Sequence, residues 1–91
     1  MAGLLDMAID QFWRAQQSNT EIDCASQTAN GLQLFCAAVQ ESTGSPDTYF
    51  PMAIDHFWQA QQLGMSGDSF NCLLQMANGI QRFCAALAPR T

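Results

Sequence analysis

The chain has 91 residues, of which 48% are apolar and only 12% are charged, and its formal net charge is −5. This length fits a single domain, 1–91, with one modest hydrophobic core. The three basic residues are all arginines and form no cluster, which argues against binding to nucleic acid or to an anionic membrane. There is no basic N-terminal segment and no apolar run near the roughly 20 residues of a membrane span, so we expect a soluble, cytoplasmic protein.

The first predicted helix contains the segment MAIDQFWRAQQ (residues 7–17). Apolar residues at three- and four-residue spacing predict the inner face of this helix. These residues are Leu5, Ala8, Ile9, Phe12 and Ala15. Trp13 is predicted to lie at the edge of the inner face, and Met7 is predicted to lie among polar residues.

The second predicted helix follows the short segment SNT, and Thr20 with Asp23 resembles a capping box at its start. Two apolar stripes run side by side along it and together cover about 160° of its surface, which is wider than the usual amphipathic face. One stripe consists of Ile22, Ala25, Ala29, Leu32, Cys36 and Val39, and the other of Cys24, Thr28, Gly31, Phe35 and Ala38. Gly44 marks the expected end of the helix.

The third predicted helix repeats the first, because MAIDHFWQAQQ (residues 52–62) matches residues 7–17 at nine of eleven positions. We expect Thr48 to cap its start and Gly64 to mark its end. Its predicted inner face consists of Phe50, Ala53, Ile54, Phe57 and Ala60. Trp58 is predicted at the edge of that face, and Met52 among polar residues.

The fourth predicted helix repeats the second, because CLLQMANGIQRFCAA (residues 72–86) matches residues 24–38 at ten of fifteen positions. Asp68 or Ser69 is expected to cap it. The same two apolar stripes recur. One consists of Phe70, Leu73, Ala77, Ile80, Cys84 and Leu87, and the other of Cys72, Met76, Gly79, Phe83 and Ala86.

The chain therefore contains two similar helical repeats, at about 4–42 and about 49–88, joined by a linker at about 43–48 that is rich in Gly, Ser and Pro. No segment shows the period-2 alternation of a strand. We predict an all-α fold in which two duplicated antiparallel helical hairpins form a pseudo-twofold four-helix bundle. The alternative is an open pair of hairpins that closes only by dimerising.

Each repeat contains an Asn-Gly pair, usually a turn signal, inside a predicted helix. A glycine within a helix costs about 1 kcal/mol relative to alanine, so something must offset this cost. Gly31 and Gly79 fall on the side predicted to be buried. We interpret both as positions of close helix packing, with the rings of Trp13 and Trp58 as candidate neighbours. A turn at the pair and a binding role for the asparagines are the alternatives.

The four cysteines permit several states. If the second and fourth helices run antiparallel, Cys24 would pair with Cys84 and Cys36 with Cys72. If they run parallel, Cys24 would pair with Cys72 and Cys36 with Cys84. A zinc site is not expected because the chain has no CxxC pair. In a cytosolic protein we expect free thiols that serve as small hydrophobic side chains, and a redox role for Cys24 or Cys72 is the alternative.

No constellation predicts chemistry. His56 is the only histidine, and it replaces a glutamine of the first repeat, which is typical of a surface position. Asp10 precedes Arg14 by four residues, which predicts a solvated ion pair, and Asp55 has no such partner. We find no phosphate-binding loop or nucleophile motif. We therefore expect no enzymatic activity, no catalytic residue, no metal and no cofactor.

The composition favours a small acidic helical protein–protein interaction module that either associates with itself, as a homodimer, or acts as an adaptor for another protein. Low charge and edge tryptophans are typical of a surface that another helix covers. The residues expected to bind a partner are Trp13, Trp58, Met7 and Met52. The alternative function is binding of a small apolar ligand within the bundle, beside the small residues Ala29, Gly31, Ala77 and Gly79.

Overall fold

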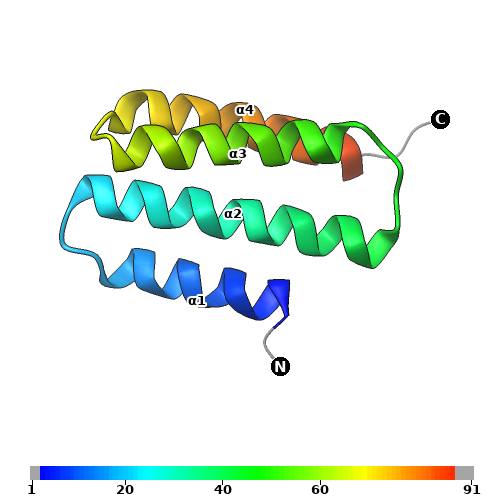
Figure 1. Cartoon of the computed structure of the whole chain (residues 1–91), viewed down its shortest axis with the longest axis horizontal. Coiled ribbons are helices and arrows are strands. Elements are labelled where there is room, and N and C mark those ends of the chain that lie inside the picture. Colours follow the sequence, from blue (N-terminus) through cyan, green and yellow to red (C-terminus); the bar gives the residue numbers. More distant parts are fainter. Residues whose placement is uncertain (1–2, 88–91) are drawn as a thin grey trace.

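The computed structural model describes residues 3–87 and confirms the all-α, four-helix bundle. The helices are α1 (Leu4–Gln17), α2 (Glu21–Thr43), α3 (Tyr49–Met65) and α4 (Ser69–Leu87). They run back and forth in chain order (Figure 1). The two predicted repeats correspond to α1–α2 and α3–α4, and the second repeat's last predicted residue, at position 88, lies outside the described range. The pseudo-twofold relation between the repeats stays a prediction.

Several helix ends form as the sequence indicates. The Thr20 hydroxyl accepts a hydrogen bond from the Asp23 backbone N–H at 3.1 Å, which caps the start of α2. The Asp68 carboxylate accepts from the Asn71 backbone N–H at 3.1 Å and caps α4 in the same way. Gly44 ends α2 in the left-handed conformation, with φ of 62°, which glycine adopts without steric cost.

The two ends of α3 differ from the prediction. Thr48 makes no side-chain cap, and the Asp47 carboxylate instead accepts a hydrogen bond from the Tyr49 N–H at 2.9 Å. Gly64 does not end α3 but lies buried within its last turn, where an added Cβ would be 3.1 Å from the Ser26 side chain. Gly67, with φ of 96°, supplies the left-handed residue instead.

The bundle is flat, and its Cα atoms extend 43 × 32 × 16 Å. Within the described residues, α1 contacts α2 alone, α2 also contacts α3 and α4, and α3 contacts α4. Figure 1 shows α1 along one edge, with α3 and α4 on the other side of α2. Because α1 and α4 do not meet, each of them has a side that faces none of the other helices in residues 3–87.

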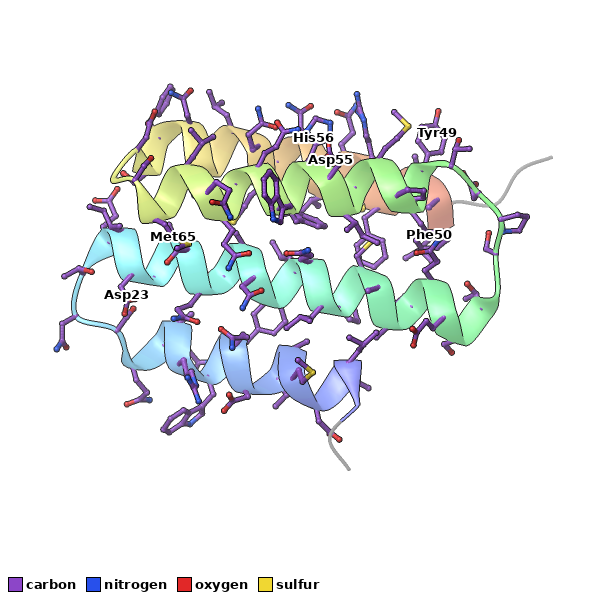
Figure 2. The ribbon with its side chains drawn as sticks, in the orientation of Figure 1. Asp23, Tyr49, Phe50, Asp55, His56 and Met65 are labelled. Atoms are coloured by element: carbon purple, nitrogen blue, oxygen red, sulfur yellow. The ribbon has the colours of Figure 1, made fainter. Side chains whose placement is uncertain are left out.

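The hydrophobic core lies where α2, α3 and α4 meet. One cluster of buried residues consists of Ala25, Ala29, Ala60, Cys72 and Met76, and the other of Cys36, Phe50, Ala53, Phe57 and Phe83. Figure 2 shows Phe50 directed from α3 toward α2. Helix α1 contributes only the buried Ala8 and Ala15, so it is the least deeply packed of the four.

A phenylalanine ring lies against a glycine in each hairpin. A Cβ at Gly31 would lie 2.6 Å from Cε1 of Phe12, and a Cβ at Gly79 would lie 2.5 Å from Cε1 of Phe57. Both distances are shorter than real Cβ contacts. The neighbouring rings are therefore those of phenylalanines and not the tryptophans expected from the sequence, whose side chains are more than half exposed. The energetic role of this close packing stays a prediction.

Candidate interaction surface

Helix α4 presents a continuous row of apolar side chains to solvent. Its residues are Phe70, Leu73, Ala77, Ile80, Cys84 and Leu87, and all of them are exposed. Leu73 and Ile80 retain 53% and 42% of their accessible surface. The spacing of three or four residues places these side chains on one face of the helix. We call this row the α4 face.

The same positions in the first repeat are covered. Counted with the repeat offset of 48 residues, Leu73, Ala77, Ile80 and Cys84 correspond to Ala25, Ala29, Leu32 and Cys36. Ala29 and Cys36 have 0% exposure, and Leu32 packs against both core clusters. Helix α3 covers this part of α2, where the Cys36 thiol lies 3.9 Å from the Phe50 carbonyl. In α4 the second stripe, with Cys72, Met76 and Phe83, is the buried one.

Helix α1 also carries exposed apolar residues. Leu5 and Ile9, predicted to lie on the inner face, are 53% and 59% exposed. That prediction is wrong for these two residues because α1 meets only α2, through the side that carries Ala8 and Ala15. We call Leu5, Ile9, Phe12 and Trp13 the α1 face; Phe12 is half-buried and the other three are exposed.

The residues predicted to bind a partner are all at the surface, but they do not lie on one side of their helices. Trp13 and Trp58 are 59% and 51% exposed, and Met7 and Met52 are also exposed. The tryptophan lies six positions after the methionine in each helix, which places the two side chains about 120° apart. The described structure brings Trp13 beside Ile9 on the α1 face. The partner-binding role of all four residues stays a prediction.

An apolar groove adjoins the α4 face. It lies between α2 and α4 and has a volume of about 230 Å³. Its lining includes Cys24 and Thr28 from α2, and Leu73 and Met76 from α4. Further along the same pair of helices, the rings of Phe35 and Phe83 meet edge to face at 5.5 Å between centroids. The surface between α2 and α4 is therefore apolar over much of its length.

The polar side chains are arranged elsewhere. A second groove, of about 370 Å³, lies among α1, α2 and α3 and is lined mainly by polar residues that include Gln11, Asp23, Asn30 and Gln61. Figure 2 shows Asp55 and His56 on the side of α3 away from α2. The His56 ring nitrogen Nδ1 lies 2.7 Å from the Gln75 side-chain oxygen, which fits a structural contact between α3 and α4.

The predicted ion pair is present on the outer side of α1. The Arg14 guanidinium lies 3.0 Å from the Asp10 carboxylate, and both side chains are more than half exposed. At the equivalent place in α3, the Gln59 amide donates a hydrogen bond to Asp55 at 2.8 Å. Exposed pairs of this kind stabilise a helix by only a few tenths of a kcal/mol. They indicate a solvated surface and provide no acid–base chemistry.

The cysteines are all free thiols, two buried and two exposed. Burial raises the pKa of the Cys36 thiol to about 11. Burial also raises the pKa of the Cys72 thiol; a hydrogen bond with the Gly64 backbone lowers this pKa in part, and the negative charge of Asp68 adds to the rise. A redox role needs an accessible thiol of low pKa, and the buried thiol of Cys72 does not favour one. Cys24 and Cys84 are exposed rather than buried as expected.

The structure shows two further features that bear on function. Among residues 3–87, no group of three or more His, Cys, Asp or Glu side chains is placed to hold a metal ion. No helix in the same range combines the length and hydropathy that crossing a membrane requires.

Sequence reasoning missed the α4 face and the exposed residues of the α1 face. One signal could have revealed the α4 face: the apolar arc of about 160° is wider than one packed neighbour requires.

Comparison with other proteins adds no further assignment, because no protein-family model, curated protein or solved structure matches this chain.

Proposed function

We propose that this protein is a small, acidic, non-catalytic interaction module that associates with itself through exposed apolar helix faces. The observation that carries the proposal is the α4 face, a row of six exposed apolar residues along a single helix. Soluble monomers rarely expose long contiguous apolar patches, and those that do commonly use them for binding. Self-association, with a homodimer as its smallest form, would remove this surface from water.

The absence of charge on the α4 face supports the same proposal. Each of its six residues is uncharged, so covering the face requires no desolvation of an ionised group. The chain as a whole carries a net charge of −5, and two copies therefore repel each other at low ionic strength. Salt screens this repulsion without weakening apolar contacts. We expect association to strengthen as salt increases.

The proposal is tested with two substitutions on the same helix that add the same charge. Ile80→Asp places a carboxylate in the middle of the α4 face, whereas Asn78→Asp places one about 200° around the helix. Ile80 and Asn78 are both exposed, so the monomer should retain its helical circular dichroism in both variants. Sedimentation velocity should show association of the wild type and Asn78→Asp, and loss of association in Ile80→Asp.

Two results would contradict the proposal. The first is a wild-type chain that sediments as a monomer at every concentration and salt level. The second is equal association of Ile80→Asp and Asn78→Asp, since a charge in an apolar interface must weaken it.

The alternative function, binding of a small apolar ligand, has the groove between α2 and α4 as its support. At about 230 Å³ this groove is smaller than the roughly 300–1,000 Å³ of common ligand pockets. It differs from the predicted location, because Ala29, Gly31 and Gly79 are buried in helix contacts. Native mass spectrometry distinguishes the alternative: extra small-molecule mass on a monomer would favour a ligand, and multiples of the chain mass would favour association.

A further inference from the structure

We infer that the partner of the α4 face is the α1 face of a second copy of this chain, docked as α3 docks on α2 within one copy. This inference rests on the proposed self-association and names the two surfaces that meet. The reason is the internal repeat. In the centre of the molecule, α2 and α3 pack against each other. The repeat gives the same molecule a second face like that of α2, on α4, and a second face like that of α3, on α1, and these two faces are uncovered.

The complete form of this interface is the contact between α2 and α3. On the α2 side, the contact uses the row that contains Ala29, Leu32 and Cys36. On the α3 side, Phe50 and Phe57 are buried in the cluster with Cys36, and Ile54 packs against it. The exposed fractions of Phe50 and Phe57 are 1% and 0%.

The α4 face repeats the first half of this contact. Ala77, Ile80 and Cys84 stand where α2 has Ala29, Leu32 and Cys36, so the alanine and the cysteine are retained and leucine is replaced by another branched aliphatic residue. None of the four described helices covers this row, because α3 packs on the other stripe of α4.

The α1 face repeats the second half. With the repeat offset of 45 residues, Leu5, Ile9 and Phe12 correspond to Phe50, Ile54 and Phe57. The corresponding residues of α3 are buried or half-buried, whereas Leu5 and Ile9 are exposed and Phe12 is half-buried. These α1 residues are therefore less buried than their counterparts in α3. This difference is expected because α3 packs there on α2, whereas in a single copy no described helix packs on the α1 face.

The rest of the N-terminal hairpin fits the same placement. In the C-terminal hairpin, Cys72, Met76 and Phe83 lie buried among residues of α2 and α3. Their counterparts in α2 are Cys24, Thr28 and Phe35, which are exposed or half-buried in a single copy. A second copy whose α1 covered the α4 face would bring these α2 residues toward the first copy as well.

The loop ends of the helices also allow the contact. Helix α1 ends at Gln17, whereas α3 continues to Met65, which corresponds to position 20 of the first repeat. The shorter α1 leaves space where α4 carries the larger Leu73 and Leu74 in place of Ala25 and Ser26. At this end of the proposed contact, the space left by the shorter α1 therefore accommodates the larger side chains of α4.

This contact joins different faces of the two copies, so it is heterologous. The assembly as a whole still has one free α1 face at one end and one free α4 face at the other, unless it closes into a ring. Terminal repeats of solenoid proteins usually have a polar outer side that stops such growth. Both outer helices of this chain have apolar residues on that side.

The test mixes two variants that each lack one face. Ile9→Asp removes the α1 face and leaves the α4 face, and Ile80→Asp does the reverse. Each variant alone should bind itself at least about 100-fold more weakly than the wild type, as expected for burying a carboxylate in place of an isoleucine. Mixed in equal amounts, with one variant labelled with ¹⁵N, they should form a mixed dimer and no larger species in native mass spectrometry.

Matched controls separate the faces from the added charge. Arg14→Gln lowers the net charge by the same one unit, five positions after Ile9 and about 140° around α1. Arg14 is exposed and the second repeat has Gln59 at this position, so we expect this variant to associate as the wild type does. Ile9 and Ile80 are exposed in the single copy, so circular dichroism should show that both variants fold. Leu5→Asp with Leu73→Asp provides a second pair.

The outcomes distinguish this inference from the proposed function. A mixture that stays monomeric, while the wild type associates, overturns the pairing of α1 with α4 and leaves self-association intact. Loss of association in Ile80→Asp together with full association of Ile9→Asp also overturns it, because that result indicates α4 against α4. A wild-type chain that never associates refutes the proposed function itself.

Discussion

The close contact between Gly79 and Phe57 makes a quantitative prediction about a single methyl group. In Gly79→Ala the new Cβ would lie 2.5 Å from Cε1, 2.7 Å from Cδ1 and 3.0 Å from Cζ of Phe57. The Phe57 ring has 0% exposure and lies between α4 and α2, so it cannot move aside without disturbing the core. Overpacking of this kind costs about 1–3 kcal/mol.

The opposing term is helix propensity. Replacing a mid-helix glycine by alanine stabilises a helix by about 1 kcal/mol, which leaves a net loss of about 0–2 kcal/mol. Because the Phe57 ring is fully buried, we expect Gly79→Ala to fall in the upper half of this range, with a loss of about 1–2 kcal/mol of unfolding free energy. A loss of 1 kcal/mol lowers Tm by about 4–8 °C in a domain of this size. Urea unfolding followed by circular dichroism measures the change, and repetition at two protein concentrations separates folding from association.

Gly31→Ala is the matched comparison, because Gly31 occupies the same place in the first repeat and gains the same helix propensity. Its Cβ would lie 2.6 Å from Cε1 of Phe12, but Phe12 is only half-buried and its ring can move toward solvent. We expect a loss of less than about 1 kcal/mol. If Gly79→Ala is as stable as the wild type, or if Gly31→Ala is the more damaging change, the close-packing account is wrong.

Two further predictions concern acid stability and thiol reactivity. Hydrogen bonds from the Asn71 side chain and backbone lower the pKa of Asp68 in the folded protein. The ionised Asp68 carboxylate therefore stabilises the fold at pH values above its unfolded pKa of about 3.9. This stabilisation is lost as the pH falls through the lower pKa of the folded state. We expect Asp68→Asn, which keeps a cap without the titration, to show a smaller decrease of Tm on acidification than the wild type, and equal decreases would contradict this reasoning. In a dilute monomer, the exposed thiols of Cys24 and Cys84 should react rapidly with maleimide, whereas those of Cys36 and Cys72 should react slowly because they are buried and their pKa values are raised. Rapid labelling of all four thiols would show that the core is less closed than described.

The local signals in the sequence predicted the helices and most of their ends. The Thr20 hydroxyl, the Asp68 carboxylate and the left-handed Gly44 depend on neighbours within a few residues, so the sequence contains all the information that they require. Gly64 was misassigned because its place is set by Ser26 and Cys72, which lie against it from other helices. A glycine required for close contact between helices and a glycine required for a helix end look the same in sequence.

The orientation of the helices could not be predicted in the same way. Periodicity shows that Leu5, Ile9 and Ile80 are apolar and share faces with other apolar residues. It does not show which apolar stripe a neighbour covers, because that depends on which helices meet in the fold. Among the described helices, α2 meets α1, α3 and α4, whereas α1 meets only α2, and α4 meets only α2 and α3. The candidate surface consists of the faces of α1 and α4 that these contacts leave uncovered.

The most direct test of the account is sedimentation equilibrium of the wild-type chain over a wide range of concentration and at two salt levels. The account predicts an average mass that rises above the 10.0 kDa of one chain as concentration increases, and rises at lower concentration when salt is added. An average mass that stays at 10.0 kDa under all conditions would contradict it, and the exposed apolar residues of α1 and α4 would then need another explanation.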